Sequence, residues 1–133
     1  MKFLALVCWV TIAVAATPVS DPPRKLIETR SYPNGWEADM GALDFLAKTL
    51  QDEVVATGII FVYGANREVA ENVERRLHCF ENYMTQRRGI PSNRIRVMTG
   101  GYRKHATIEL WLVPSGAETP KKTPTLGRED VRS

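Results

Sequence analysis

A run of five β-branched or aromatic residues, Ile59–Tyr63, lies between two glycines and constrains the fold more than any other part of the sequence. Such an uninterrupted run, bounded by residues that punctuate local structure, predicts a strand in the centre of a sheet. The chain has 133 residues, enough for one domain, and 25% of them are charged, as in ordinary soluble proteins. We therefore expect one globular domain built around a sheet.

Two amphipathic helices are predicted, one before and one after this strand. The first covers Met40–Glu53, with Asp39 as its N-cap, and the second covers Glu68–Arg88. Gly89 follows the second helix as a C-cap, and Pro91 prevents its continuation. The apolar faces, at helical spacing, consist of Met40, Leu43, Leu46, Ala47 and Leu50 in the first helix and of Val69, Val73, Leu77, Phe80 and Met84 in the second.

Three further strands complete the predicted sheet. Alternation of apolar and polar residues predicts strands over Arg94–Met98 and Thr107–Val113, with a turn at Gly100–Gly101 between them. A weaker alternation predicts an edge strand over Leu26–Tyr32. The order of elements is then strand, helix, strand, helix, strand, strand (βαβαββ). Two helices on one face of a four-stranded mixed sheet are the natural packing for this order, so we expect an α+β two-layer sandwich.

The first sixteen residues have the composition of a secretory signal peptide. Lys2 precedes an apolar segment that is interrupted only by Thr11 and that ends in small residues. The segment is shorter than the roughly 20 residues that a membrane-spanning helix needs. We expect cleavage after Ala15 or Ala16, no transmembrane segment after cleavage, and export to the periplasm or the cell exterior. A buried N-terminal helix is the alternative.

The composition also changes at both ends of the expected domain, Leu26–Pro114. Residues 17–25 contain three prolines and few apolar residues, which predicts a linker. Residues 115–133 are rich in threonine and charge and have no periodicity, which predicts a disordered tail. After signal cleavage Cys79 is the only cysteine, so no internal disulfide can form, and a small buried hydrophobe is its expected role.

The charge of the chain is nearly balanced, at +3 overall, which does not indicate a polyanionic partner. The distribution is uneven, because the segment from Arg75 to Lys104 holds eight basic residues and one acidic residue, Glu81. Two interpretations remain: a surface for an anionic polymer, or a solvated periphery, which we favour. Export argues against nucleic acid as a partner.

No catalytic or metal-binding motif is present in the sequence. His78 and His105 have no cysteine or carboxylate at ligand spacing, so no metal site is predicted. Nucleophile elbows, phosphate-binding loops and paired-carboxylate motifs are also missing. We therefore expect a protein that is not an enzyme and that needs no cofactor.

Several segments together resemble the OmpA-like domain. They are the strand Ile59–Tyr63 with Gly64, then Glu74-Arg75-Arg76, Asn82-Tyr83-Met84 and Arg88-Gly89-Ile90. The resemblance covers Leu26–Pro114, and it is closest to a variant from exported proteins of environmental bacteria. That variant carries a cysteine in the helix, a Gly-Gly-Tyr-Arg turn and a Glu-Leu-Trp-Leu-Val-Pro strand, as at Cys79, Gly100–Arg103 and Glu109–Pro114.

The resemblance implies binding of peptidoglycan. In the family an arginine and an aspartate grip the carboxylate of diaminopimelate, and Arg76 matches the arginine. A guanidinium suits this role because its planar donors match a carboxylate two at a time. Where the aspartate is expected, after Gly64, the chain has Ala65-Asn66-Arg67, so Asn66 and Arg67 join Arg76 as candidate ligand residues. The alternative is that Arg76 is a surface arginine lying over the edge of the core.

A second hypothesis places function on the other face of the sheet. If Ile108 and Leu110 face the helices, Trp111 faces away, together with Phe61 and Tyr63, and a two-layer fold leaves that face open. It would then bind an envelope protein without binding peptidoglycan, and the alternative is that the tail or the linker covers it. In either case we expect a monomeric, non-catalytic binding module, periplasmic or secreted, or associated with the outer membrane.

Overall fold

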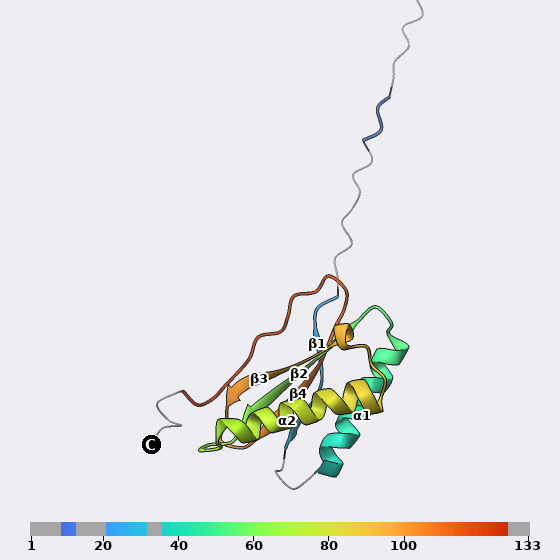
Figure 1. Cartoon of the computed structure of the whole chain (residues 1–133). Helices are drawn as coiled ribbons and strands as arrows, with labels where there is room; N and C mark the ends of the chain where they lie inside the picture. The colour runs from blue at the N-terminus through green and yellow to red at the C-terminus, as the bar shows by residue number, and fades with distance from the viewer. Residues whose placement is uncertain (1–8, 13–20, 32–35, 128–133) are drawn as a thin grey trace, which may run out of the picture.

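The computed structural model describes residues 9–12, 21–31 and 36–127 (Figure 1). Most of the expected signal peptide, residues 17–20 of the expected linker and residues 128–133 of the expected tail lie outside the described residues. The four described residues of the signal segment, 9–12, form no regular secondary structure, and all four are exposed. The exposed fraction of Trp9, for example, is 87%. These four residues therefore do not form part of a buried helix. No described helix combines the length and apolar character needed to cross a membrane.

The fold is α+β, with a four-stranded mixed sheet and two α-helices in the order expected from the sequence. The elements are β1 Arg24–Arg30, α1 Trp36–Asp52, β2 Thr57–Gly64, α2 Ala70–Asn82, a π-helical turn Tyr83–Arg87, a 3-10 turn Ser92–Arg94, β3 Ile95–Tyr102 and β4 Thr107–Val113. The strand order is β1-β4-β2-β3, in which β2 and β3 are parallel and the other pairs are antiparallel. Both helices lie against the same side of the sheet (Figure 1).

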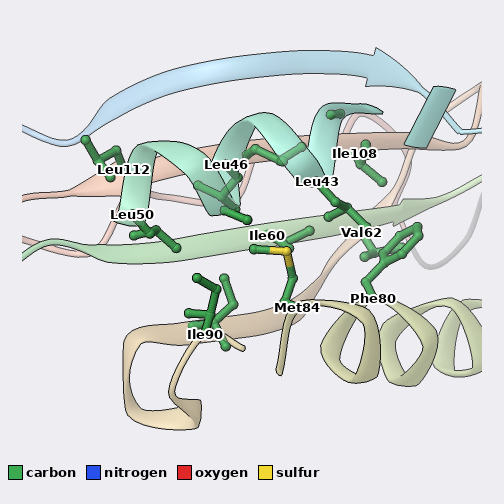
Figure 2. Close-up of a cluster of buried hydrophobic side chains, with 14 of the residues drawn as sticks. Leu43, Leu46, Leu50, Ile60, Val62, Phe80, Met84, Ile90, Ile108 and Leu112 are labelled. Carbon is green, nitrogen blue, oxygen red and sulfur yellow. The ribbon is translucent and has the colours of Figure 1, made fainter. Parts of the chain in front are cut away.

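The main core lies between the helices and the sheet (Figure 2). Strand β2 is central, and its run Ile59–Tyr63 is buried on both faces, as the sequence predicts. Its even-numbered residues Ile60 and Val62 face the helices, while Ile59, Phe61 and Tyr63 form a second cluster on the outer face of the sheet. Side chains labelled in Figure 2 that meet in the main core include Leu43, Leu46 and Leu50 of α1, Phe80 of α2, Met84, Ile90, Ile108 and Leu112.

The first helix begins earlier than expected, at Trp36, and Asp39 is not its N-cap. Asp39 lies inside the first turn, where its Oδ2 atom accepts a hydrogen bond of 2.8 Å from the hydroxyl of Ser31. At the other end of this helix, the guanidinium of Arg94 donates hydrogen bonds to the backbone carbonyls of Leu50, Glu53 and Ala56. These bonds satisfy carbonyl groups that a helix leaves unpaired at its C-terminus.

The predicted second helix consists of two parts, because the α-helix ends at Asn82 and a π-helical turn follows. In this turn the N–H of Arg88 donates to the carbonyl of Tyr83, five residues earlier. The hydroxyl of Tyr83 donates to Asp44 of α1, which Arg88 also contacts, so the turn links the two helices. Val69, placed on the apolar stripe by its spacing, precedes the helix and is 56% exposed.

The expected turn at Gly100–Gly101 is wrong, because both glycines lie inside β3 and the connection to β4 follows Tyr102. Gly100 has a packing role instead. A Cβ atom at this position would lie 2.5 Å from Cζ of the Tyr63 ring, so only glycine lets β3 pass this ring.

The expectation of a disordered tail is wrong for residues 115–127, which have defined positions against the domain (Figure 1). Residues 115–126, here called the C-terminal strap, run back along the sheet. Ala117 packs on the outer cluster, and the N–H groups of Thr125 and Leu126 both donate to the carbonyl of Tyr102. The sequence of the strap has no period, and individual contacts hold the strap in place.

Candidate functional site

Arg76, the residue singled out by the resemblance, lies in α2 with 11% of its side chain exposed. Its Nη2 atom donates to both carboxylate oxygens of Glu68, at 2.8 Å each. Glu68 belongs to the turn between β2 and α2, and the backbone N–H of Ala65 donates to its Oε2 atom at 2.7 Å. The turn therefore holds Glu68 in place, and Glu68 holds one end of the guanidinium.

The other end of the Arg76 guanidinium is buried without a partner. Neither Nε nor Nη1 forms a hydrogen bond with any residue that the structure describes. An unpaired buried donor costs about 1–3 kcal/mol, and more when it carries charge, so native proteins rarely leave one without a role. The Nε–H bond points to the Nη2 side of the planar group, so Nε and Nη1 donate in different directions and each can bond a separate acceptor.

A complementary acceptor lies nearby on α1. Asp39 is 3% exposed, and while Ser31 occupies its Oδ2 atom, its Oδ1 atom has no partner among the described residues. Burial raises the pKa of Asp39, and the hydrogen bond from Ser31 and the positive charge of Arg76 lower it in part. This electrostatic interaction shows that the two side chains share one environment, although they come from different helices.

The site thus combines two unpaired donors with one unpaired acceptor, and Glu68 balances the charge of Arg76. A ligand that carries a carboxylate and an ammonium group on neighbouring atoms complements this arrangement. The carboxylate can accept a hydrogen bond from Nε or from Nη1 of Arg76, and the ammonium matches Oδ1 of Asp39.

The structure does not bring Asn66 and Arg67 into this site. Both are exposed at the tip of the turn, where Arg67 has a φ of 63°, and no hydrogen bond or ion pair joins either to Arg76 in the described part of the chain. The acid that pairs with Arg76 is Glu68, which the sequence interpretation missed. Glu68 is the only carboxylate between β2 and α2, and this signal was available in the sequence.

The outer sheet face is not the open surface that the second hypothesis requires. Phe61 and Tyr63 are both 0% exposed, and Trp111 is half-buried. They pack in one cluster with Ala117, because the strap lies over this face. The expectation that this face is open is therefore wrong for Phe61 and Tyr63, and the strap lies over it, as in the alternative in which the tail covers the face.

A network of charged groups fastens the strap to this face. Glu109 is 1% exposed, and its carboxylate lies 2.9 Å from Nζ of Lys25 and 3.4 Å from Nη2 of Arg103. The hydroxyl of Tyr63 donates to Glu109 and accepts the backbone N–H of Thr123 in the strap. Arg103 stacks over the Tyr63 ring and donates to the Thr123 hydroxyl at 2.7 Å.

No protein-family model matches the sequence, and no curated protein matches it either. In the described residues no group of three or more histidine, cysteine or acidic side chains could hold a metal ion. Cys79 is half-buried on α2.

Proposed function

We propose that this protein is an exported, non-catalytic module that binds peptidoglycan through Arg76. The observation that carries the proposal is the pair of buried, unpartnered N–H groups on Arg76 in the same environment as the unpartnered Oδ1 atom of Asp39. Diaminopimelate in peptidoglycan carries a carboxylate and an ammonium group on one carbon atom, which is the combination that these atoms complement.

Each residue has a separate role in the proposed complex. Arg76 receives the carboxylate of the ligand in a charge-assisted hydrogen bond from Nε or Nη1. Asp39 accepts from the ammonium group. Glu68 holds the third nitrogen of the guanidinium, so the donors are oriented before the ligand arrives and less conformational entropy is lost on binding.

Glu68 takes the place of the aspartate that the resemblance leads one to expect. It follows Gly64 by four residues, and its carboxylate contacts Arg76 directly. In this proposal Glu68 supplies the acid from the turn before α2, and α1 supplies a second acid, Asp39. Binding to the cell wall requires export, which agrees with the expected signal peptide.

Sedimentation with insoluble peptidoglycan tests the proposal. The purified protein should pellet with peptidoglycan that contains diaminopimelate, and Arg76→Lys should abolish pelleting because lysine keeps the charge but cannot bond Glu68 and the ligand through separate planar N–H groups. Arg75→Lys is the matched control, since Arg75 is the preceding residue of the same helix and is exposed. Equal pelleting of the wild type and Arg76→Lys would refute the proposal, as would failure of the wild type to pellet.

A further inference from the structure

A pocket of about 520 Å³ lies at the end of β1, separate from the Arg76 site. Three parts of the chain form its walls: the end of β1, the connection between β3 and β4, and the C-terminal strap. The residues that line the pocket include Thr29, Arg30, Arg103, Lys104, Thr123 and Thr125.

The pocket is cationic, with three cations, Arg30, Arg103 and Lys104, and one carboxylate, Glu28, on its walls. Arg103 is already paired, since it donates to Glu28 at 2.8 Å and to the Thr123 hydroxyl. By contrast, the side chains of Arg30 and Lys104 form no hydrogen bond or ion pair within the described part of the chain, so two positive charges remain unbalanced.

Neutral donors from two different parts of the chain also line this pocket. The hydroxyl groups of Thr29 on β1 and Thr125 on the strap make no hydrogen bond with any described residue, so both can donate to a ligand. Two unpaired cations and two free hydroxyl groups therefore line one pocket, and together they can bond an anion with several oxygen atoms. A dianionic phosphate group fits this set better than a single carboxylate, because it offers three oxygen atoms and balances both charges.

We propose that this pocket binds a phosphate group, either inorganic phosphate or the phosphate of a small phosphate monoester. The site is independent of the proposed peptidoglycan site, shares no residue with it and recognises a different chemical group. Because the strap supplies Thr123 and Thr125, the complete pocket exists only when the strap is docked. Phosphate binding therefore stabilises the docked strap by linkage, in proportion to the occupancy of the site.

Calorimetric titration of the purified full-length protein tests this proposal, with sodium phosphate and glucose 6-phosphate as separate probes at constant ionic strength. We expect saturable binding of at least one probe. The double variant Arg30→Gln/Lys104→Gln should bind at least about tenfold more weakly, because it loses two charge-assisted contacts. The control Arg75→Gln/Arg87→Gln removes two exposed arginines that do not line the pocket and should bind as the wild type does.

The two probes distinguish the source of the phosphate group. Binding of inorganic phosphate indicates free phosphate as a sufficient ligand, whereas binding of the sugar phosphate alone indicates a phosphate monoester. The proposal is overturned if neither probe binds saturably, or if both double variants bind as the wild type does. It is also overturned if both double variants lose affinity equally, since this would indicate non-specific attraction to net charge.

The rate of amide hydrogen exchange in the strap provides a second readout, which is independent of the calorimetric signal. Saturating ligand should slow exchange of the Thr125 and Leu126 amides, which bond to the carbonyl of Tyr102. Sodium chloride at the same ionic strength should leave their exchange unchanged. Equal slowing by chloride would overturn the proposal, because it would show a general effect of salt on the strap.

Discussion

Tyr63 and Glu109 lie on neighbouring strands, and the hydroxyl of Tyr63 donates a hydrogen bond of 2.7 Å to the buried carboxylate of Glu109. Burial raises the pKa of Glu109, but the contacts with Lys25 and Tyr63 and the charge of Arg103 outweigh it, so the net pKa is lowered. The same hydroxyl accepts the N–H of Thr123, so a single atom joins a buried charge to the strap.

The lowered pKa of Glu109 predicts how stability changes with pH. The charged form contributes stability that is present above the ordinary glutamate pKa and lost as the pH falls through the lower pKa of the folded state. Glu109→Gln should therefore lower the free energy of unfolding at neutral pH by about 2 kcal/mol, because Lys25 and Arg103 lose their shared counterion. The loss should shrink as the pH is lowered.

Urea unfolding of both proteins at neutral and acidic pH measures this difference. Glu118→Gln is the control, because Glu118 is an exposed acid in the strap and forms no ion pair with a described residue. A difference between the wild type and Glu109→Gln that stays constant across the pH range would contradict the lowered pKa.

Tyr63→Phe should loosen the strap while leaving the ring in the core. The variant loses the bonds to Glu109 and Thr123, and we expect a loss of about 1–2 kcal/mol together with faster proteolysis within residues 118–126. Tyr102→Phe is a matched control, because the hydroxyl of Tyr102 forms no hydrogen bond with a described residue. Equal cleavage of the two variants would show that the Tyr63 hydroxyl does not hold the strap.

Arg94→Lys should destabilise the fold by about 1–2 kcal/mol, because a single ammonium group cannot reproduce the fork that bonds three carbonyls at the end of α1. Arg96→Lys provides the comparison, since Arg96 is exposed on β3 and its side chain bonds no described residue other than Met98, through the sulfur. Urea unfolding measures both variants, and a loss of the same size in each would argue against the capping role of Arg94.

Two glycines should respond to alanine in opposite directions. Gly100→Ala places a methyl group against the Tyr63 ring and should destabilise the protein by about 1–3 kcal/mol. Gly41→Ala meets no atom within 4 Å in the exposed interior of α1 and should stabilise it by about 0.5–1 kcal/mol. Thermal unfolding distinguishes the two effects, and destabilisation by Gly41→Ala would contradict the open space found at this position.

The sequence predicts the elements whose apolar residues form a continuous run or repeat with the period of a helix or a strand. The run Ile59–Tyr63 identifies the central strand because all five residues are buried, and the period of α1 identifies the face that meets the sheet. The bounds of β4, Thr107–Val113, also agree with the prediction, since alternation and Pro114 both end there.

The features that the sequence does not predict depend on contacts between distant residues. Gly100 remains in a strand because of the Tyr63 ring, and Thr123 is placed by Tyr63 and Arg103. Asp39 has the spacing of an N-cap, yet its position beside Arg76 depends on how the helices pack. Arg76 and Glu68 can both be identified from the sequence, whereas the place of Asp39 in the candidate site required the fold.

The most direct test of the proposed function follows the Nε–H signal of Arg76 by NMR during titration with meso-diaminopimelate. This atom is buried and has no partner among the described residues. If the site binds a carboxylate, the signal should shift saturably, and the shift should vanish in Asp39→Asn, which loses the acceptor charge for the ammonium group. A signal that stays in place at millimolar ligand would show that Arg76 serves only its ion pair with Glu68, and the peptidoglycan proposal would fail.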